Sequence, residues 1–455
     1  MRIVIIGAGE VGRYLAKGLS SEAKDVIIID RNEQRLITLQ EQLDVQTVHG
    51  DGSSLDVLRR AGADRADILI AVTDSDEGNM MACVVSRVYF SIPRVIARIR
   101  NAEYTAPPIL NKLSIDMAIS PEKEAAEHIV RLIHTPGASE VLDFEQGKVL
   151  LVGYKVDEDS DLLHRPLKDL SGLREASVLL AAILRDERVQ IPRGEDQLRV
   201  GDTVYAVAPR SQIGYLSKLF HTDGQEVQRV MIIGGSMIGT LLARQLESEG
   251  LQVKLIEPSI QRCHILSEAL DQTVVLHGDP THIDFLTEEN IEDMDVCVAV
   301  SDDEQTNILV SLLAKRLGTR RIICAVTKSE YIPIATSVGI DAVISPRLSA
   351  ASAMLRFIRA GSVLSVGTLR DSEAEAMEVV AQATSSIVNR PIAELDFPKD
   401  AIIAAIIREN QIIIPQGNDM IIPGDRVILF TLAKAVRKVE KSLQIQGGRG
   451  TRSLG

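Results

Sequence analysis

Aromatic residues, paired cysteines and long apolar runs are all scarce in this chain of 455 residues. Phe, Trp and Tyr together make up 3% of it and Trp is absent, so aromatic platforms for stacking nucleic-acid bases are not expected. The net charge of −13 repels phosphate backbones and disfavours adhesion of the chain to anionic lipid. The composition therefore predicts that nucleic acid is not a partner.

The four cysteines do not form a metal-binding pattern. Cys83, Cys263, Cys297 and Cys324 include no CxxC pair, and the last two lie in apolar runs typical of strands. We expect buried thiols and a reducing, cytoplasmic compartment. The sequence contains no run of about 18 apolar residues, so we expect no membrane-spanning helix. The first apolar run is too short for a signal peptide. Any role at a membrane is therefore expected to depend on a partner.

What the chain does contain is an internal repeat, because landmarks of the first half recur in the second with a nearly constant offset. The recurring pairs are Ile5–Gly12 and Ile232–Gly239, Val48–Asp51 and Leu276–Asp279, Ala71–Asp74 and Ala299–Asp302, Ser120–Pro121 and Ser345–Pro346, His164–Leu170 and Asn389–Leu395, Ile191–Gly194 and Ile414–Gly417, and Gly201–Val204 and Gly424–Val427. The chain is therefore expected to consist of two copies of one unit.

Each copy has two parts of different character. In the first part, predicted strands alternate with helical segments, which indicates a parallel α/β sheet of the Rossmann type. These strands are Arg2–Ile6, Asp25–Asp30, Gln46–His49, Ile68–Val72 and Arg94–Arg98. The second part suggests a small α+β domain with a largely antiparallel sheet. Its predicted strands are Lys148–Val156, Ser177–Leu184, Arg188–Ile191 and Thr203–Val207, followed by a helix from Ser211.

These patterns predict four domains and a tail. The Rossmann domains are expected at 1–136 and 228–361, and the small domains at 137–222 and 362–443. The polar stretch His221–Gln228 is interpreted as the linker between the halves. Residues 444–455 are expected to be disordered.

A GxGxxG motif follows the first predicted strand and opens a helix. It consists of Gly7, Ala8, Gly9, Glu10, Val11 and Gly12. The first glycine permits a tight turn, the second lets backbone amides approach a pyrophosphate, and the third lets the helix pack on the sheet. The helix N-terminus then faces the phosphates. Asp30 ends the second strand, where its carboxylate can accept hydrogen bonds from a ribose, which favours NAD over NADP. Arg31 is the one neighbour that suits a 2′-phosphate.

Further candidates lie where other strands end, because ligands of open α/β sheets bind at the carboxyl ends of strands. They are Asp51, Thr73, Asp74 and Arg98. Asp and Thr are also ordinary turn and cap residues, and Arg98 can pair with either a phosphate or a carboxylate. Asn79 and its counterpart Asn307 can cap a helix or touch a ligand, and the sequence does not distinguish these roles.

The second half departs from this pattern. Its glycine loop is Gly234, Gly235, Ser236, Met237, Ile238 and Gly239, so Ser236 stands where the second motif glycine belongs. Its Cβ limits close backbone approach. Glu257 replaces Asp30, Ser301 and Asp302 replace Thr73 and Asp74, and in our alignment Val326 replaces Arg98. The fold is expected to be retained. Whether the second site binds a nucleotide or the repeat is kept only for its packing surface stays open, and the two sites can differ in ligand or affinity.

Residues expected of an enzyme are missing. A dehydrogenase needs a proton donor or acceptor beside the nicotinamide, yet no His–Asp or Lys–Glu arrangement recurs in both small domains. His164, for example, is replaced by Asn389 in the second copy. There is no P-loop, HExxH or GxSxG motif. We therefore expect no catalytic residue and no metal site.

The repeated landmarks resemble those of the peripheral regulatory subunits of bacterial Trk potassium-uptake systems. In these proteins each half is an RCK (regulator of potassium conductance) unit with an N-terminal Rossmann lobe and a C-terminal lobe. The resemblance extends over nearly the whole chain and rests on the glycine loops, the His-Gly-Asp and Val-Thr/Ser-Asp segments, and the Gly-Asp segments of the small domains.

This resemblance implies a function. Such proteins bind NAD(H) and adenine nucleotides (ATP, ADP), assemble into homo-oligomeric rings at the cytoplasmic face of the inner membrane, and regulate a membrane-embedded transporter through ligand-dependent changes of ring shape. The first glycine loop, Asp30, Thr73, Asp74 and Arg98 match family binding positions. Two alternatives remain, an NAD-dependent oxidoreductase and a structural adaptor with vestigial nucleotide sites.

Overall fold

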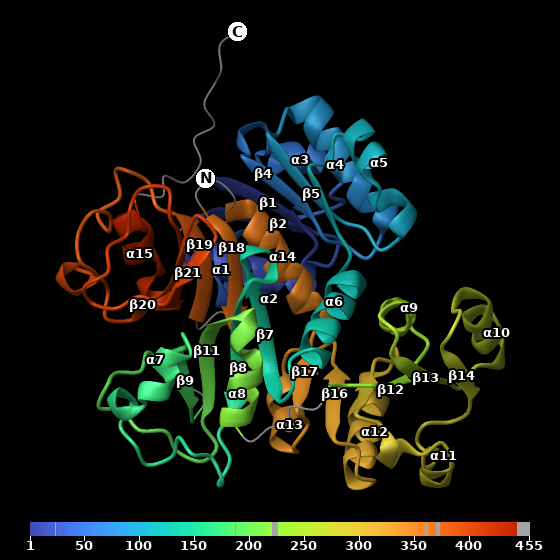
Figure 1. Ribbon diagram of the computed structural model, residues 1–455. Coiled ribbons are helices and arrows are strands. Elements are labelled where there is room, and N and C mark those ends of the chain that lie inside the picture. Colours follow the sequence, from blue (N-terminus) through green and yellow to red (C-terminus); the bar gives the residue numbers. More distant parts are fainter. Residues whose placement is uncertain (23, 187, 221–225, 360–362, 370–373, 444–455) are drawn as a thin grey trace. The chain divides into compact units, whose positions relative to one another are not determined.

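The computed structural model describes residues 1–22, 24–186, 188–220, 226–359, 363–369 and 374–443, which form two compact units (Figure 1). Unit 1 contains residues 1–125 together with 327–329 and 345–358. Unit 2 contains residues 126–326, 330–344 and the described residues from 359. The predicted tail at 444–455 and residues 221–225 of the predicted linker lie outside the described residues.

Unit 1 is built on a six-stranded parallel sheet in the order β3-β2-β1-β4-β5-β6. Its strands are β1 (Arg2–Ile6), β2 (Asp25–Asp30), β3 (Gln46–His49), β4 (Ile68–Ala71), β5 (Arg94–Arg98) and β6 (Met117–Ile119). The first five are confirmed, with β4 ending one residue earlier than predicted. The strand order reverses beside β1, and ligands of doubly wound sheets bind at the carboxyl ends of the strands at such a switch point.

Helices cover both faces of this sheet. They are α1 (Glu10–Ser21), α2 (Glu33–Gln42), α3 (Leu55–Arg60), α4 (Asp76–Phe90) and α5 (Pro107–Lys112). Alternate residues of each strand point to opposite faces, so Ile3 and Ile5 of β1 pack with α1 and α2, whereas Val4 and Ile6 pack with α3 and α4. Because both faces are covered, the strands are apolar throughout, as is typical of parallel sheets.

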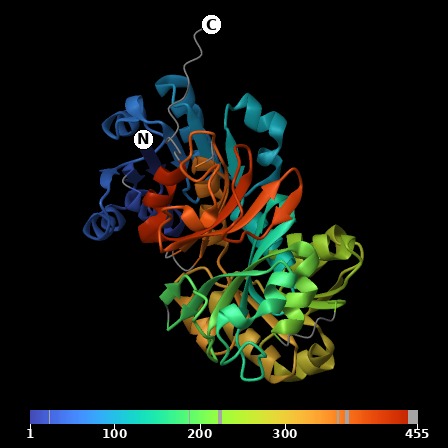
Figure 2. The ribbon, with the colours of Figure 1, turned by 60° about the vertical axis from the view of Figure 1, so that its left-hand side comes forward.

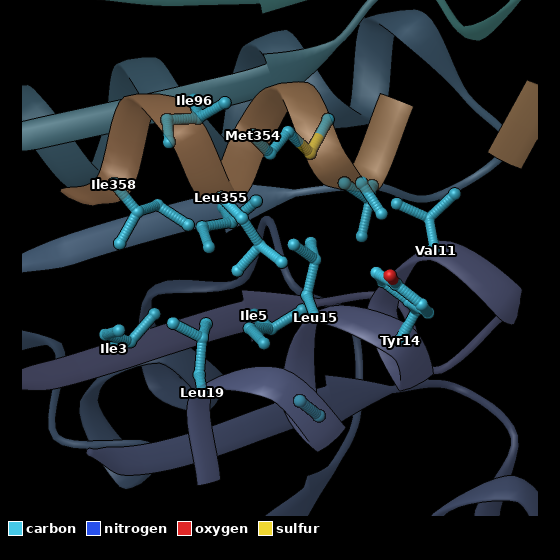
Figure 3. Close-up of a cluster of buried hydrophobic side chains, with 14 of the residues drawn as sticks. Ile3, Ile5, Val11, Tyr14, Leu15, Leu19, Ile96, Met354, Leu355 and Ile358 are labelled. Carbon is cyan, nitrogen blue, oxygen red and sulfur yellow. The ribbon is translucent and has the colours of Figure 1, made fainter. Parts of the chain in front are cut away.

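The first sheet is completed by a helix from the other half of the chain. Helix α14 (Pro346–Arg359) places Met354, Leu355 and Ile358 in the hydrophobic cluster that contains Leu15 and Leu19 of α1 (Figure 3). Ile358 also accepts a 3.2 Å hydrogen bond at its carbonyl from the Arg94 guanidinium at the start of β5. The first Rossmann core is therefore formed by residues more than 300 positions apart in sequence.

The Rossmann sheet of unit 2 repeats the topology of the first, in the order β14-β13-β12-β15-β16-β17. Its elements are β12 (Arg229–Ile233), α9 (Met237–Ser248), β13 (Gln252–Glu257), α10 (Ile260–Ala269), β14 (Val274–His277), α11 (Ile283–Glu288), β15 (Val296–Ala299), α12 (Glu304–Arg316), β16 (Arg321–Ala325), α13 (Tyr331–Ser337) and β17 (Ala342–Ile344). The predicted retention of the fold in the second half is confirmed.

One predicted correspondence between the halves was wrong. The sheet pairs Arg94 with Ile68 and Arg321 with Val296, so Arg321 is the counterpart of Arg94, and Ala325, not Val326, is the counterpart of Arg98. Counted from Asn79 and Asn307, the second copy reaches its fifth strand one residue earlier than the first, which shifts β16 relative to the predicted correspondence. No arginine stands at the Arg98 position of the second half, as expected.

The connecting helix α6 (Pro121–Ile133) begins in unit 1 and ends in unit 2. At its C-terminal end, the buried Arg321 guanidinium donates to the carbonyl oxygens of Leu132 at 2.6 Å, Thr135 at 3.1 Å and Ala138. The last carbonyls of a helix have no partner within it. Arg321 supplies one, as Arg94 does for α14.

The two small domains are antiparallel sheets and both lie in unit 2 (Figure 2). The first has the order β10-β9-β11-β8-β7 and the second β18-β19-β22-β20-β21. The elements are β7 (Ala138–Phe144), β8 (Val149–Lys155), α7 (Ser171–Glu175), β9 (Leu179–Arg185), β10 (Arg188–Gln190), β11 (Thr203–Pro209), α8 (Ile213–Leu219), β18 (Val363–Leu369), β19 (Ala374–Val380), β20 (Ala401–Arg408), β21 (Gln411–Ile413), β22 (Arg426–Leu432) and α15 (Val436–Leu443). The α+β prediction is confirmed.

The two small sheets share one hydrophobic core. Phe144, Leu151 and Val207 of the first sheet belong to the same buried cluster as Ile428 and Phe430 of the second. Neither sheet alone encloses these side chains, so the two small domains stabilise each other. The two paired sheets belong to the same chain, because the repeat gives each chain two small domains.

The Gly-Asp segments of the small domains have a structural role. Asp202 is almost fully buried and accepts hydrogen bonds from both Nε and Nη2 of Arg185, at 2.8 and 2.6 Å. Asp425 and Arg408 form the same pair in the second copy, at 2.9 and 2.8 Å. A bidentate pair of this kind holds two strands in register, which explains why these segments recur.

Candidate nucleotide sites

The first glycine loop has the geometry that the motif predicts. Gly7 has φ +112, and a Cβ there would lie 3.0 Å from the backbone of Val72. A Cβ on Gly12 would lie 1.8 Å from the Gly7 carbonyl oxygen, so α1 approaches the loop as closely as glycine allows. A Cβ on Gly9, which caps α1, would meet no atom within 4 Å. Only Gly9 therefore leaves open space where a phosphate group can approach the loop.

The acid at the end of β2 is fixed against this loop. Asp30 accepts a 2.5 Å hydrogen bond at Oδ2 from the Ala8 amide and a 2.7 Å bond at Oδ1 from the Asn32 amide. Each carboxylate oxygen has a second lone pair for a ribose hydroxyl. Arg31 points to Asp51, with 2.6 Å between Nη2 and Oδ2. Arg31, the residue suited to a 2′-phosphate, is thus paired with a carboxylate of the protein.

Asp51 lies at the turn after β3. Its Oδ1 accepts hydrogen bonds from the amide and hydroxyl of Ser53, at 3.0 and 2.9 Å. The bond from the Ser53 amide, with help from Arg31, lowers the pKa of the Asp51 carboxyl. Asp51 therefore has the turn-forming role that was one of its two predicted roles, and its carboxylate remains partly exposed beside Arg31.

Thr73 and Asn79 are joined at the end of β4. Asn79 is fully buried, and its Oδ1 accepts from the amide and hydroxyl of Thr73 at 2.9 and 2.7 Å. Its Nδ2 donates to the carbonyls of Thr73 and Arg98 at 3.1 and 2.9 Å. All four hydrogen-bonding positions of this amide group are used within the protein. Asn79 therefore shapes the strand ends and is not itself exposed to a ligand.

The Arg98 side chain lies among carboxylates. Its Nη1 is 3.0 Å from Oδ1 of Asp74, and its Nη2 is 3.8 Å from Oε1 of Glu122. The Asp74 side chain is 90% exposed and the Arg98 side chain 11%, so in this pair the arginine is fixed by its surroundings whereas the aspartate is not. A phosphate can replace Asp74 as partner of this guanidinium. Glu10 and Val11 form the first turn of α1, where Glu10 is half-buried and Val11 packs into the core.

In the second half the loop satisfies its own polar groups. Ser236 is buried, and its hydroxyl donates to the Val300 carbonyl at 2.5 Å and accepts from the Gly239 amide at 3.2 Å. The Gly239 amide is one of the donors at the N-terminus of α9 that a phosphate would otherwise use. A Cβ on Gly235 would lie 2.4 Å from Leu266, so this loop is more crowded than the first.

The remaining second-half candidates keep the first-half arrangement. Glu257 is buried and accepts from the amides of Gly235 and Ser259 at 2.8 and 3.0 Å. Ser301 is held by Asn307 through the same set of bonds as Thr73 and Asn79, with Ala325 in the place of Arg98. Gly234 has φ +105. Ile238 and Gly239 are buried at the start of α9, whereas Met237 is exposed.

Sequence reasoning missed Arg262. Its Nη2 donates to the Gly235 carbonyl at 2.8 Å, and its Nη1 is 3.2 Å from Oδ2 of Asp302. This side chain thus links the glycine loop to the end of β15. The corresponding residue of the first half is Arg35, whose side chain is exposed. The only signal in the sequence was that an arginine recurs at this position in both halves, and that did not reveal the contact with Asp302.

Other chemistry is not found in the described part of the chain. Within those residues, no group of three or more His, Cys, Asp or Glu side chains could hold a metal ion. All four cysteines are buried, as predicted. Burial raises the pKa of Cys297 to about 12 and that of Cys324 to about 11, so these thiols stay protonated. None of the described helices is both long and apolar enough to cross a bilayer.

Comparisons with known proteins identify the family. The TrkA-N domain family matches residues 3–121 and 230–346, and the TrkA-C domain family matches 151–221 and 376–444. The Trk system potassium uptake protein TrkA of Azorhizobium caulinodans is 38% identical over 98% of this chain and 99% of its own length. The chain belongs to the TrkA family. TrkA of Halomonas elongata is 39% identical with the same coverage.

Solved structures confirm the TrkA-type fold. The GsuK channel bound to NAD matches with a TM-score of 0.60 at 18% identity, covering 98% of this chain and 79% of the channel chain. The GsuK RCK domain matches with a TM-score of 0.60 at 20% identity, covering 98% of this chain and 95% of that domain. At this identity the likeness establishes the tandem Rossmann and small α+β architecture alone. That architecture is the one expected from the resemblance to RCK units.

Proposed function

We propose that this TrkA-family protein is the nucleotide-sensing regulatory subunit of a potassium-uptake transporter. It acts at the cytoplasmic face of the membrane, is held there by its transporter, and is not an enzyme. NAD(H) is its ligand in the first half, with ATP and ADP as further regulatory ligands. The observation that carries this proposal is the pairing of an open glycine loop at Gly9 with Asp30, which is fixed beside that loop by the Ala8 amide.

We match the pyrophosphate and the adenosine ribose of a dinucleotide to groups of the first site. The pyrophosphate fits the amides at the N-terminus of α1, and the adenosine ribose fits Asp30. Asp51 and Arg31 border the adenosine side, whereas Thr73, Asp74 and Arg98 border the opposite side of the loop. The GsuK channel, which shares the fold, has been solved bound to NAD and bound to ADP.

The second site is proposed to differ from the first. Ser236 uses the Gly239 amide, and Arg262 links Gly235 to Asp302. A dinucleotide has to break these contacts before it can bind, so its affinity there is reduced. A nucleotide whose phosphate draws Arg262 away from Asp302 is the better match. Gly234, Glu257 and Ser301 then serve this ligand as Gly7, Asp30 and Thr73 serve the first.

Regulation follows from linkage. A nucleotide that binds one shape of a homo-oligomeric ring more tightly shifts the ring toward that shape, and the membrane partner responds to the shift. A ligand that binds both shapes equally has no effect. The duplicated architecture suits such an assembly, because each chain already contains two similar units.

The test is the thermal stability of the purified protein with NAD, NADH, ATP, ADP or no ligand. A ligand that binds the folded state raises the melting temperature. We expect NADH to raise it in the wild type and to have a smaller effect in Asp30→Ala. Absence of a shift with every nucleotide would contradict ligand sensing and favour the structural adaptor. Hydride transfer from NADH to any substrate would instead favour the oxidoreductase.

A further inference from the structure

Four cations lie along one side of the last described helix, α15. Lys434 lies in the 3-10 turn that leads into the helix, and Arg437, Lys438 and Lys441 follow on the same side, because residues three or four apart share a helix face. All four side chains are exposed. The opposite side of α15 carries Val436, Val439 and Leu443, which are buried in the core of the second small domain. We name these four cations the α15 basic stripe.

Helix α8 of the first half is the copy of α15 and provides an internal reference. Aligning β11 with β22 places Ser211, Gly214, Tyr215 and Lys218 at the positions of the four cations. The buried positions are preserved, since Ile213 and Leu216 correspond to Val436 and Val439. Packing of this helix on its sheet therefore does not require cations. Three of the four charges belong to the second copy alone.

The charge of this segment is opposite to that of the chain. From residue 434 onward the sequence contains six Lys or Arg residues and one Glu, whereas the whole chain has a net charge of −13. Lys434 has an acidic neighbour, Asp400, at 3.0 Å, but both side chains of this pair are largely exposed. Exposed pairs of this kind are weak and readily exchanged. This side of α15 therefore carries a local positive charge that can attract an external anionic surface.

We propose that the α15 basic stripe binds the anionic headgroups of a phospholipid membrane. Cytoplasmic loops of membrane transporters are rich in Lys and Arg, so they repel a basic surface, whereas an anionic leaflet attracts it. Nucleic acid is disfavoured by the acidic remainder of the chain. The apolar side of α15 is already packed in its own domain, so the helix adheres through charge and does not insert. Such adhesion weakens as salt increases.

This site is separate from the nucleotide sites and adds a second tether to the membrane. The net charge of the chain argued against adhesion to lipid, but net charge is an average, and adhesion depends on the charges within a Debye length of the surface. A regulator that touches both its transporter and the surrounding lipid is held at a fixed height above the membrane. The inference concerns binding alone and stands apart from the proposed nucleotide sensing.

The experiment is co-sedimentation of the full-length protein with vesicles of phosphatidylcholine, either pure or mixed with phosphatidylglycerol. We expect binding to the mixed vesicles at low salt, at least a tenfold loss in the combined variant Arg437→Gln, Lys438→Gln and Lys441→Gln, and loss of wild-type binding at high salt. The matched control, Arg165→Gln with Arg188→Gln and Arg193→Gln, removes the same charge from exposed positions of the first small domain. It should bind as the wild type does.

Three outcomes would overturn the proposal. They are equal binding to both kinds of vesicle, an equal loss in the control variant, and no binding to mixed vesicles at low salt. Retention on immobilised polyglutamate without vesicle binding would assign the α15 basic stripe to an acidic protein segment instead. The melting temperature, with and without NADH, shows that the variants are folded. It also keeps a failure of lipid binding distinct from a failure of nucleotide sensing.

Discussion

The hydroxyl of Ser236 donates a 2.5 Å hydrogen bond to the carbonyl oxygen of Val300 and so joins the second glycine loop to the end of β15. At the corresponding position of the first loop, Gly9 has no side chain, and a Cβ there would meet no atom within 4 Å. One half thus closes its loop with a side chain while the other leaves it open. Substitutions at Gly9 can therefore test whether the first half is the one that binds a dinucleotide.

Gly9→Ala should separate ligand binding from folding. Gly9 has an extended backbone with φ −75, so alanine fits without strain, and we expect the melting temperature without ligand to change by no more than about 1 °C. The added methyl group projects into the space that a pyrophosphate needs. The melting-temperature increase caused by NADH should therefore shrink or disappear. Thermal scans with a series of NADH concentrations measure both quantities.

Gly12→Ala is the contrasting control, because its Cβ would lie 1.8 Å from the Gly7 carbonyl oxygen. That variant should lose stability even without ligand. If Gly9→Ala bound NADH as tightly as the wild type, the pyrophosphate would not lie over this loop. The proposed site in the first half would then be wrong, although the fold would remain as described.

Asn79→Asp should destabilise unit 1 although the two side chains have nearly the same size. The amide Nδ2 donates to the carbonyls of Thr73 and Arg98, and an aspartate places a charged oxygen against both. Loss of these bonds at a fully buried position costs about 2–4 kcal/mol. Urea unfolding measures the change. Asn307→Asp should cost a similar amount in unit 2, since Asn307 makes the same contacts, whereas a negligible change in both variants would contradict this role.

The sequence predicted much of this fold because local patterns determine it. The apolar runs at Arg2–Ile6 and Asp25–Asp30 are long enough to reveal strands, and the repeat shows each motif twice. The three-residue strand β6 is too short to show a periodicity. The packing of α14 on the first sheet depends on contacts between residues more than 300 positions apart, which no local pattern encodes. The link from Arg262 to Asp302 was missed for the same reason.

The stability of unit 2 should depend on the protonation of Glu378. Burial raises the pKa of this carboxyl, the charges of Glu145 and Asp143 add to the increase, and the hydrogen bond from the Glu145 amide and the charge of Arg426 oppose it. Arg426 pairs with Glu145, and its distance to Glu378 is 3.8 Å. Lys148 also faces Glu145, at 3.4 Å. The folded protein therefore holds a proton on Glu378 more tightly than the unfolded chain does.

A raised pKa fixes the sign of the pH dependence. The stabilisation from protonated Glu378 is fully present below the pKa of the unfolded chain and is lost as pH rises through the higher folded pKa. Glu378→Gln mimics the protonated form and still accepts the bond from the Glu145 amide. It should be more stable than the wild type at about pH 8, with a gain that fades toward about pH 4. Urea unfolding across this range tests the prediction, with the exposed Glu158→Gln as control. A gain that grew as pH fell would contradict it.

Arg321→Met should be strongly destabilising. Burial lowers the pKa of Arg321 to about 10, and the charge is tolerated because three carbonyl oxygens accept its hydrogen bonds, one in the last turn of α6 and two between there and the start of β7. Methionine fills a similar volume but leaves those carbonyls without a donor, which costs about 3 kcal/mol or more. Arg94→Met is the matched variant, because Arg94 is only partly buried and bonds a single helix-end carbonyl, that of Ile358. It should cost about 1 kcal/mol, and equal losses in the two variants would show that burial of Arg321 does not determine the effect.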